Sequence, residues 1–459
     1  MGFRLVEFKK LWGDPFFSKP PNLDEQVGEI CIDSRKIKPG NFFVPIVGDN
    51  FDGHDFLHEA FEKGIQAAVI NKSFQKRIPN GLLYWRVENS LKAYQQIALL
   101  HRLQFDISLI AITGSVGKTT TRELIQSMIS HVGPVLSTSE NNNNDIGVPL
   151  TLLQANKKHS AIVLEMGMRG LGEIERLSDC AQPDIAVITN IGTAHIGKLG
   201  TRKNIAVAKC EITSSLRSNG SVVIPADDPL LEKELKRNWS GRIIKVDVKE
   251  NNSTSSENYE CDYLGIVDLE SRIISVNGRS YWLPLRGMHN ARNFILALAV
   301  AFEMNVPLAK LDRLNLKMPK GRNTCLKIGQ LTIFDETYNA SPESVIASLK
   351  LLKAEPGRHI AVLGTMLELG THSIDCHRRV IIEAVNLGLH GLIIVSEGSE
   401  AEVMSLEAEK IPLLAVVTNP KDAEPYLKAW LKQGDSLLLK GSRKIQLETL
   451  LPFLKDIFK

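Results

Sequence analysis

A glycine-rich turn between an apolar strand and a helix carries the clearest chemical signal in this sequence. The strand-like segment SLIAIT (108–113) is followed by Gly-Ser-Val-Gly-Lys, and TTTRELIQSMI then has a helical pattern. Glycines let the backbone wrap around phosphate oxygens, and the helix N-terminus adds positive potential. Lys118 would reach the β- and γ-phosphates of a nucleotide, and the Thr119 hydroxyl would bind Mg²⁺. The expected phosphate cradle comprises Thr113, Gly114, Ser115, Val116, Gly117, Lys118, Thr119 and Thr120.

This turn is shorter than the general phosphate-binding loop, G-x-x-x-x-G-K-[ST], because Ile112 stands where the first glycine belongs. The alternative interpretation is a plain glycine turn that joins a strand to a helix. A lysine and a threonine at this point serve no packing purpose, which favours phosphate binding.

Two polar residues lie at or near the ends of predicted strands. Glu165 is in the apolar segment SAIVLEM, and His195 lies shortly after DIAVIT. Ligands of open parallel sheets gather at the carboxyl ends of the strands. A carboxylate and an imidazole that converge on a Mg-ATP site would be metal ligands. Each residue taken singly is also compatible with an ordinary polar group at the end of a strand.

Lys209 lies in the helical segment NIAVAKCEI among small neighbours, Ala206, Ala208 and Cys210. One interpretation is a solvated surface charge. The other is a lysine that faces the site. If burial depresses its pKa, the neutral amine can take up CO₂ as a carbamate.

Polar residues also cluster at the start of a long helix. His289 and Asn293 are four residues apart and Asn290 and Asn293 three apart, so all three share one helix face. Helix capping by Asn290 is the alternative, and it accounts for one of the three side chains.

A second polar cluster, DETYNASP (335–342), follows a strand-like segment. Asp335 and Asn339 could hydrogen-bond a ribose and a base. Arg322, at a predicted domain junction, could contact a γ-phosphate. The alternative is an ordinary loop with a helix that starts at Ser341 and Pro342.

The elements that position these residues fall into three ranges. Residues 1–105 hold short strands and turns and end in a helical stretch (91–104). Residues 106–318 alternate apolar strands with helices, as do residues 319–459, and this pattern is typical of buried parallel strands. We therefore expect an α/β protein of three domains, with a central doubly wound parallel sheet that carries the phosphate loop and a C-terminal Rossmann-like domain.

The end of the central range departs from this alternation. The polar stretch KENNSTSSENYE (249–260) indicates a loop, and residues 261–285 indicate a small antiparallel insertion. Asn277-Gly278 between apolar runs predicts a hairpin turn.

Composition narrows the class of protein. The chain has 459 residues, of which 43% are hydrophobic and 23% charged, with a net charge of +3. These values exclude disordered, collagen-like and disulfide-scaffold chains, and the small charge favours no nucleic-acid partner. The six cysteines form no C-x-x-C pair. With no signal-peptide pattern, a myristoylation pattern broken by Val6, and no long apolar run, we expect a cytoplasmic protein without membrane insertion.

Together these motifs resemble the Mur ligases, the ATP-dependent amide-bond ligases of peptidoglycan synthesis. The resemblance covers nearly the whole chain, through motifs in the same order. The motifs are DSRKIKPGNFFVPIVGDNFDGHDF (33–56), TGSVGKTT (113–120), NNNNDIGVPLTLL (141–153), EMGMRGLGEI (165–174), TNIGTAHIG (189–197), AVAKCEI (206–212), GMHNARN (287–293), DETYNASP (335–342), LGTMLELG (363–370) and KGSRKIQLE (440–448). The Asn-rich stretch and Gly172-Glu173-Ile174 favour the member that uses a tripeptide and D-alanyl-D-alanine over the one that adds the third peptide residue.

The resemblance implies an N-terminal domain for the UDP-sugar, a central ATPase domain and a C-terminal domain that completes the nucleotide site. It implies that ATP and Mg²⁺ are the cofactors and that Lys118, Lys209 and His195 are catalytic, with Lys209 carbamylated. The implied metal ligands are Thr119, Glu165, His195 and Lys209. The implied nucleotide ligands beyond the phosphate cradle are Asn290, Arg322, Asp335 and Asn339. The implied substrate ligands are Ser34, Arg35, Asn143 and Asn144.

The implied reaction starts with phosphorylation of the tripeptide carboxylate of UDP-N-acetylmuramoyl-tripeptide by ATP. The amine of D-alanyl-D-alanine then attacks the acyl phosphate, and phosphate leaves. Catalysis would be mainly positioning and charge neutralisation by Lys118, two Mg²⁺ ions and the loop amides. The implied partners are these two substrates alone, and we expect a monomer.

Four positions depart from the family pattern. Gly197 stands where relatives often carry Glu, Thr365 where Asp is usual, Ser341 where Asn is usual, and Glu336 where a second Asp is usual.

Two alternatives stay open. One is another ligase of the superfamily, such as a folylpolyglutamate synthetase or the ligase for the third peptide residue, and the DSR…DGHDF region disfavours the folate enzyme. The other is a nonenzymatic ATP-binding switch, which the combination of Lys118, Glu165, His195 and Lys209 disfavours.

Overall fold

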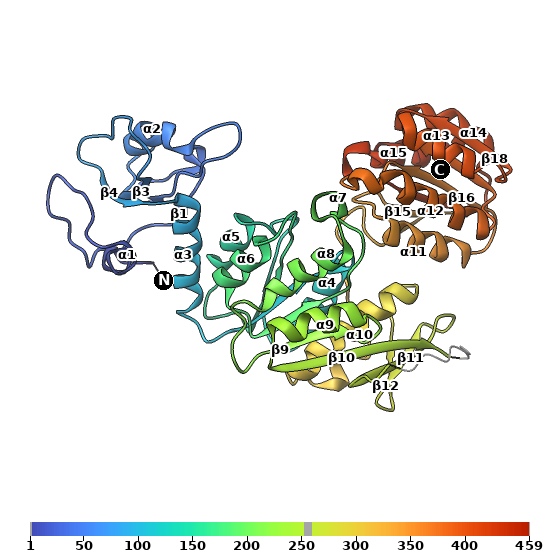
Figure 1. Cartoon of the computed structure of the whole chain (residues 1–459), viewed down its shortest axis with the longest axis horizontal. Coiled ribbons are helices and arrows are strands. Elements are labelled where there is room, and N and C mark those ends of the chain that lie inside the picture. Colours follow the sequence, from blue (N-terminus) through green and yellow to red (C-terminus); the bar gives the residue numbers. More distant parts are fainter. Residues whose placement is uncertain (1, 252–258, 459) are drawn as a thin grey trace.

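The computed structural model describes residues 2–251 and 259–458, which form three β-sheets in succession along the chain. The sheets have four, nine and six strands. Figure 1 shows an N-terminal body (blue), a central body (green and yellow) and a C-terminal body (orange and red). Each sheet lies within one of the predicted ranges 1–105, 106–318 and 319–459, while the domain boundaries themselves stay a prediction.

The N-terminal sheet is parallel, in the order β1-β2-β3-β4. Its core is aromatic, with Phe8, Phe42 and Trp85 packed together. The predicted helical stretch is confirmed as α3. The elements are α1 (Leu5–Trp12), β1 (Ile30–Cys31), β2 (Phe42–Phe43), α2 (Leu57–Glu62), β3 (Ala67–Asn71), β4 (Leu83–Val87) and α3 (Ser90–Arg102).

The central sheet has the order β13-β12-β11-β10-β9-β8-β5-β7-β6 and is parallel from β11 to β6. Its parallel strands are β5 (Ser108–Thr113), β6 (Val135–Ser137), β7 (Ala161–Glu165), β8 (Ile185–Ile188), β9 (Ser221–Pro225), β10 (Arg242–Glu250) and β11 (Tyr263–Asp268). Side chains from α4 (Lys118–Ile129) and α10 (Met288–Glu303) form one core with the sheet. Side chains from α6 (Glu173–Ala181) and α8 (Arg202–Cys210) form a separate core with it. The predicted doubly wound sheet is thus confirmed.

Further helices of the central body pack in the same core as α6 and α8. They are α5 (Gly147–Leu152), α7 (Ile196–Leu199) and α9 (Pro229–Asn238).

The predicted hairpin is confirmed: β12 (Ile273–Val276) and β13 (Arg279–Trp282) pair antiparallel around Asn277-Gly278. The predicted antiparallel insertion is wrong for β11, which pairs parallel with β10 on its other edge. The predicted loop 249–260 is wrong at its start, because β10 continues through Glu250, where it pairs with Val267. Residues 252–258 of that loop lie outside the described residues.

The C-terminal sheet has the order β14-β15-β19-β16-β17-β18, with only β14 antiparallel. Continuous apolar runs bury the inner strands β16, β17 and β19 on both faces, whereas the edge strand β18 leaves Val416 exposed. The strands are β14 (Thr324–Ile328), β15 (Leu331–Glu336), β16 (His359–Gly364), β17 (Gly391–Val395), β18 (Leu413–Val417) and β19 (Ser436–Lys440). The helices are α11 (Pro342–Lys353), α12 (Ser373–Asn386), α13 (Gly398–Glu407), α14 (Glu424–Trp430) and α15 (Leu450–Ile457).

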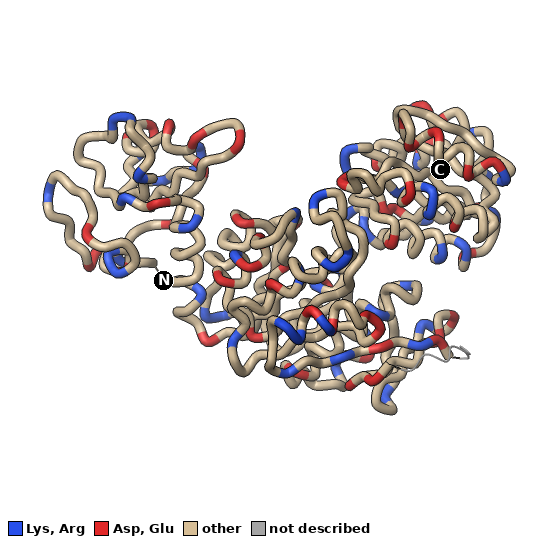
Figure 2. The backbone as a smooth tube through the Cα atoms, viewed as in Figure 1, with Lys and Arg blue, Asp and Glu red and all other residues tan. Residues whose placement is uncertain are grey.

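Charge is distributed evenly over the molecule. Lys and Arg alternate with Asp and Glu along the tube in all three bodies (Figure 2), in keeping with a net charge of +3. No helix among the described residues is long and apolar enough to cross a membrane.

Candidate active site

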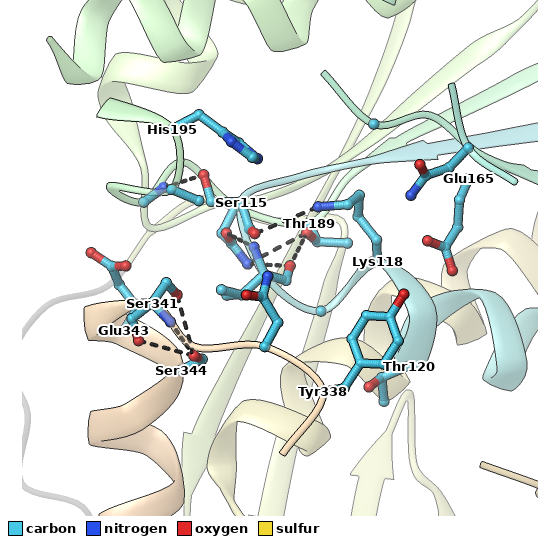
Figure 3. A pocket seen from close by; sticks show the side chains of 18 of the residues that line it. Ser115, Lys118, Thr120, Glu165, Thr189, His195, Tyr338, Ser341, Glu343 and Ser344 are labelled. Atoms are coloured by element: carbon cyan, nitrogen blue, oxygen red, sulfur yellow. Dashed lines mark hydrogen bonds between the residues drawn. The ribbon is translucent and has the colours of Figure 1, made fainter. Parts of the chain in front are cut away.

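One cavity of about 1280 Å³ is lined by residues of all three bodies. Ile46 and Val47 come from the N-terminal body, the phosphate loop from the central body, and Tyr338 and Lys440 from the C-terminal body. Figure 3 shows the loop after β5 with side chains of the central and C-terminal bodies around it. The lining lies at the carboxyl ends of β5, β7 and β8, which is where an open parallel sheet binds ligands.

The phosphate loop has the backbone that its glycines predict. Gly114 and Gly117 have φ values of 151° and 84°, and α4 starts directly afterwards at Lys118. A Cβ on Gly114 would collide with Oγ1 of Thr189, and one on Gly117 would lie 2.5 Å from Oδ1 of Asn293. Only glycine therefore fits these two positions.

A segment after β8 holds the loop in place. The Val116 N–H donates to Oδ1 of Asn190 at 3.1 Å, the Thr189 hydroxyl donates to the Val116 carbonyl at 2.5 Å, and the Gly192 N–H donates to Oγ of Ser115 at 2.9 Å. Sequence reasoning missed Thr189 and Asn190. Their position at the end of a strand beside the loop strand was the signal for them.

Lys118 folds over its own loop. Its Nζ donates to the Gly114 carbonyl at 2.5 Å. Burial, with a smaller repulsion from Arg322, lowers the pKa of Lys118 to about 8, although Glu165 opposes this shift. A weakly solvated ammonium beside the backbone of this loop is suited to bind the terminal phosphates of a nucleotide.

Glu165 ends β7 and is 2% exposed. Its Oε1 lies 3.0 Å from Nη1 of Arg122, a buried residue of α4. That oxygen accepts no hydrogen bond in the described structure. Sequence reasoning missed Arg122, which lies one helical turn after Lys118 and so shares its helix face.

His195 caps α7 with a left-handed backbone, φ 64°. Its Nδ1 lies 2.6 Å from Oε2 of Glu368, in the loop after β16. Burial and the nearby Lys118 lower the pKa of His195, and Glu368 partly opposes them. The imidazole is therefore held as a neutral ring at the edge of the cavity, the form that binds metals.

Lys209 is 2% exposed in α8, so the surface-charge interpretation is wrong. Burial, followed by repulsion from Lys118, lowers its pKa far below the usual lysine value. The physical condition for an uncharged amine is therefore met.

The predicted metal donors form a mixed set. Thr119 and Glu165 offer hard oxygen atoms, which Mg²⁺ prefers, and Oε1 of Glu165 faces the positive charge of Arg122 in this structure. His195 adds a nitrogen. Among the described residues, no group of three or more His, Cys, Asp and Glu side chains is arranged as a metal cage.

Asn290, one of the predicted nucleotide ligands, is linked through Asn323 to the helix that follows the phosphate loop. Asn290 is not the helix cap, because α10 starts at Met288 after Gly287, and the capping alternative is wrong. Its Nδ2 donates to Oδ1 of Asn323 at 2.9 Å, and Asn323 donates to Oγ1 of Thr120 at 3.0 Å. The linker before β14 thus contacts both α4 and α10.

Arg322 lies over the ring of Tyr338, with its guanidinium carbon 3.9 Å from the ring centre. Asp335 is buried and accepts hydrogen bonds from the backbone and hydroxyl of Thr337, so its carboxylate shapes the loop rather than lining the cavity. The predicted helix start is confirmed, with Ser341 as the cap and Pro342 in the first turn.

The structure brings most of the predicted residues to the cavity. The lining contains Ser115, Val116, Gly117, Lys118, Thr120, Asn143, Asn144, Glu165, His195, Asn290, Arg322 and Asn339. It does not contain the buried residues Thr113, Gly114, Thr119, Lys209 and Asp335. It also lacks Ser34 and Arg35, and the exposed Arg35 instead pairs with Asp33 at 2.9 Å.

At three of the four positions that depart from the family pattern, the side chain has a hydrogen-bonding partner nearby. Thr365 donates its hydroxyl proton to Oγ of Ser396 at 2.9 Å. Ser341 forms a capping box with Ser344. Glu336 accepts the N–H of Asn323 at 2.9 Å and lies 3.5 Å from Nζ of Lys440.

The fourth departure, Gly197, is explained by a close approach of two backbones. A Cβ on Gly197 would lie 2.6 Å from the backbone nitrogen of Gly370. A side chain at position 197 has no room in this arrangement of the central and C-terminal bodies.

Comparison with known proteins gives matches along the whole length of the chain. The family models described as "Mur ligase family, catalytic domain", "Mur ligase middle domain" and "Mur ligase, glutamate ligase domain" match residues 26–98, 112–301 and 321–443. The chain is 38% identical to the UDP-N-acetylmuramoyl-tripeptide–D-alanyl-D-alanine ligase of Synechocystis sp., over 92% of this chain and 91% of that one. It is 32% identical to the Bacillus subtilis protein of the same name, over 94% and 93%.

Solved structures agree with these matches. MurF from Acinetobacter baumannii superposes with a TM-score of 0.88 at 28% identity and covers 99% of both chains. MurF ligase from Thermotoga maritima, solved in complex with ADP, has a TM-score of 0.80 at 29% identity, with 94% and 97% of the two chains covered. The three-body α/β fold is therefore shared with these ligases.

Proposed function

The chain belongs to the Mur ligase family, and we propose that it is the ATP-dependent ligase that joins D-alanyl-D-alanine to UDP-N-acetylmuramoyl-tripeptide in peptidoglycan synthesis. The product is the UDP-muramoyl-pentapeptide. The relatives that match over nine-tenths of the chain bear the name of this ligase.

One observation carries the proposal: a single cavity holds the phosphate loop, Glu165 and His195, and residues of all three bodies line it. A nucleotide, a nucleotide-linked peptide and a third substrate have to meet in such a reaction. A cavity of about 1280 Å³ with polar groups on every side suits that encounter better than the site of a nucleotide-dependent switch.

The reaction has a chemical requirement that the residues meet. A carboxylate accepts an amine only after one of its oxygens has become a good leaving group. Transfer of the γ-phosphoryl group of ATP to the tripeptide carboxylate forms an acyl phosphate. The amine of the dipeptide then adds to the carbonyl carbon, and inorganic phosphate leaves from the tetrahedral intermediate.

Lys118 and the loop amides stabilise the charge that moves during this transfer. The ammonium of Lys118 and the N–H groups of residues 114–120 are held in place before the substrate arrives, so they reorganise little in the transition state. Arg322, which also lines the cavity, adds a second positive charge.

Mg²⁺ when bound would neutralise phosphate charge and align the reacting oxygens. Thr119, Glu165 and His195 would hold it, since their donors surround the phosphate loop. Arg122 keeps the Glu165 carboxylate beside α4.

Lys209 would add a further ligand as a carbamate. Its neutral amine attacks CO₂ and loses a proton, and the resulting carbamate presents anionic oxygens. The side chain then acts as an anion rather than as a cation.

The remaining assignments are also proposals. Ser34 and Arg35 would hold the uridine diphosphate, and Asn143 and Asn144, which line the cavity, would hold the rest of the sugar-peptide. The ranges 1–105, 106–318 and 319–459 would be the three domains. The protein would be a monomer, and the nucleotide-linked substrates support a cytoplasmic location.

Isotope transfer tests the proposed chemistry. The protein is incubated with ATP, D-alanyl-D-alanine and UDP-N-acetylmuramoyl-tripeptide labelled with ¹⁸O in its terminal carboxylate, and the products are weighed by mass spectrometry. We expect the pentapeptide and phosphate that carries one ¹⁸O atom from the carboxylate. Unlabelled phosphate together with pentapeptide would contradict the acyl phosphate, and absence of pentapeptide would contradict the function.

A further inference from the structure

The linker before β14 holds Arg322 from both sides. On one side, the N–H of Tyr338 donates to the Gly321 carbonyl at 3.1 Å. On the other side, the N–H of Asn323 donates to Oε1 of Glu336 at 2.9 Å. Gly321 and Asn323 both have left-handed backbones, with φ values of 72° and 46°. Arg322 therefore lies at the centre of a short turn that the end of β15 and the residues after it fix at two points.

The same turn is joined to the central body. Oδ1 of Asn323 accepts a hydrogen bond from Nδ2 of Asn290 in α10 at 2.9 Å. Nδ2 of Asn323 donates to Oγ1 of Thr120 at 3.0 Å, and Thr120 lies in the helix that follows the phosphate loop. Asn323 thus contacts the central body with its side chain and Glu336 with its backbone. The place of Arg322 relative to the phosphate loop depends on both contacts.

The carboxylate of Glu336 has a partner at each oxygen. Oε1 accepts the N–H of Asn323, and Oε2 lies 3.5 Å from Nζ of Lys440 at the end of β19. Lys440 is 3% exposed, and it also donates to the Asn339 carbonyl at 3.2 Å. A buried ammonium that loses its carboxylate is costly, so this pair stays together. The central strand β19 therefore fixes Glu336, and Glu336 fixes the linker.

The orientation of Arg322 matters for phosphate binding. Its guanidinium carbon lies 3.9 Å from the centre of the Tyr338 ring, and stacking on a ring holds the planar group in one orientation. The charge of Arg322 contributes to the lowered pKa of Lys118, so the guanidinium lies near the phosphate loop. Tyr338 and Lys118 line the same cavity (Figure 3). A guanidinium presents its donors as a rigid fork, so its orientation decides whether it can bind a phosphate through two bonds.

We propose that Glu336 is a positioning residue that holds Arg322, through the backbone of Asn323, in the orientation that contacts the terminal phosphate of a nucleotide. The inference rests on the nucleotide role proposed above for Arg322. It adds a chain of contacts that runs from β19 through Glu336 to the linker, and it gives a task to a carboxylate that does not itself touch the phosphate.

Arginine ¹H–¹⁵N spectra of the nucleotide-free full chain test the positioning. The Nε–H signal of Arg322 is the one missing in Arg322→Ala. The ring current of Tyr338 shifts this signal, and Tyr338→Leu gives its position without the ring. We expect Glu336→Ala to move the signal toward the position found in Tyr338→Leu, because the released linker lets the guanidinium leave the ring. An unchanged signal in Glu336→Ala would overturn the proposal.

Two controls separate this effect from a general loss of folding. Glu343 is another carboxylate of the cavity lining, but it accepts a hydrogen bond from Thr193 and not from the linker. Glu343→Ala should leave the Arg322 signal in place. Because Glu336→Ala leaves the buried Lys440 unpaired, the change is repeated in a Lys440→Met background, where it should move the signal equally. An equal movement in Glu343→Ala, or no movement in the double variant, would contradict the role given to Glu336.

Calorimetry with a non-hydrolysable ATP analogue tests the consequence for binding. We expect Glu336→Ala to raise the Kd about 10-fold, because a charge-assisted hydrogen bond to phosphate is weakened. In the Arg322→Ala background, Glu336→Ala should change nothing further, since the carboxylate acts through the guanidinium. An effect of Glu336→Ala that persists without Arg322 would overturn the proposal, and an unchanged Kd in Arg322→Ala would overturn the nucleotide role of Arg322. Neither measurement uses the peptide substrates, so a failure of the proposed ligation is recognised separately.

Discussion

At the scale of single residues, we propose that Lys118 is the cation on which the chemistry depends most. Its ammonium lies within the phosphate loop and is held there by the Gly114 carbonyl. We expect Lys118→Ala to lower ligation by at least about 100-fold, because one preorganised charge at a transferring phosphoryl group contributes several kcal/mol. Phosphate release by a mutant with wild-type circular dichroism measures the loss, and near-normal turnover would refute the assignment of the loop.

The acidity of Lys118 predicts a pH dependence of nucleotide binding. Burial lowers its pKa to about 8, so the unliganded protein holds the cation below that pH and loses it as the pH rises. The Kd of a non-hydrolysable ATP analogue, measured by calorimetry, should therefore increase above the pKa by up to about tenfold per pH unit. Lys118→Arg, which stays charged, should bind with no such slope. An identical slope in the arginine variant would assign the titration to another group.

Lys209 is the residue for which sequence was least decisive. Its burial favours the neutral amine, and the carbamate formed from it would act as an anion. Lys209→Ala should lose most activity but keep ATP binding, and short carboxylic acids in solution should restore part of the turnover. Lys209→Arg keeps a positive charge and cannot carbamylate, so it should stay inactive. Lys203→Ala, at an exposed position of the same helix, serves as the control. An arginine variant as active as the wild type would end the carbamate hypothesis.

At the scale of elements, the phosphate loop is fixed by its contact with α10. A Cβ on Gly117 would lie 2.5 Å from Asn293, and the left-handed φ of 84° adds strain for any other residue. Gly117→Ala should therefore lower the free energy of unfolding by about 1–3 kcal/mol and weaken ATP binding. Denaturant unfolding and calorimetry measure the two effects.

Gly200 supplies the matched control for this change. It has a similar φ of 76°, but a Cβ there would meet no atom within 4 Å. Gly200→Ala should therefore show only the conformational loss of stability and normal ATP binding. Equal effects on ATP binding in the two variants would contradict the role given to the Gly117–Asn293 contact.

Strands were predictable where their pattern was continuous. SLIAIT is an uninterrupted apolar run, and it became β5 with the predicted bounds 108–113. β10 was missed because charged residues alternate with apolar ones in Arg242–Glu250, and its last residues merged with a polar stretch. The parallel pairing of β11 could not be predicted from the sequence, because its partner is β10, the strand that was missed.

Site residues were predictable where the chemistry is local. The phosphate loop places a glycine turn and Lys118 on adjacent residues, so the motif is visible in one segment. Three site residues were missed because each contacts a site residue that is distant in sequence. They are Arg122, Asn190 and Glu368. No spacing rule connects Glu368 with His195, and only the docking of two sheets brings them together.

At the scale of the whole molecule, the cavity exists because the C-terminal body covers the central one. Several contacts join them, among them Glu368 with His195, Glu343 with Thr193, and Asn323 with Thr120. Glu368 lies in the loop after β16, Glu343 in the first turn of α11, and Asn323 in the linker between the bodies. The lining of the cavity therefore depends on how these two bodies lie against each other.

The N-terminal body contributes few residues to the lining. Ile46, Val47 and Leu91 come from it, while Ser34 and Arg35 lie outside the lining. The proposed choice of substrates distinguishes this ligase within its family.

Phosphate release with a panel of substrates tests that choice most directly. UDP-muramoyl-dipeptide and UDP-muramoyl-tripeptide are each offered with D-alanyl-D-alanine, L-alanyl-L-alanine, diaminopimelate, lysine or no acceptor, at saturating ATP. We expect phosphate release only when the tripeptide substrate and D-alanyl-D-alanine are present together. Equal release from the dipeptide with diaminopimelate or lysine would contradict it and would make the protein the ligase for the third peptide residue.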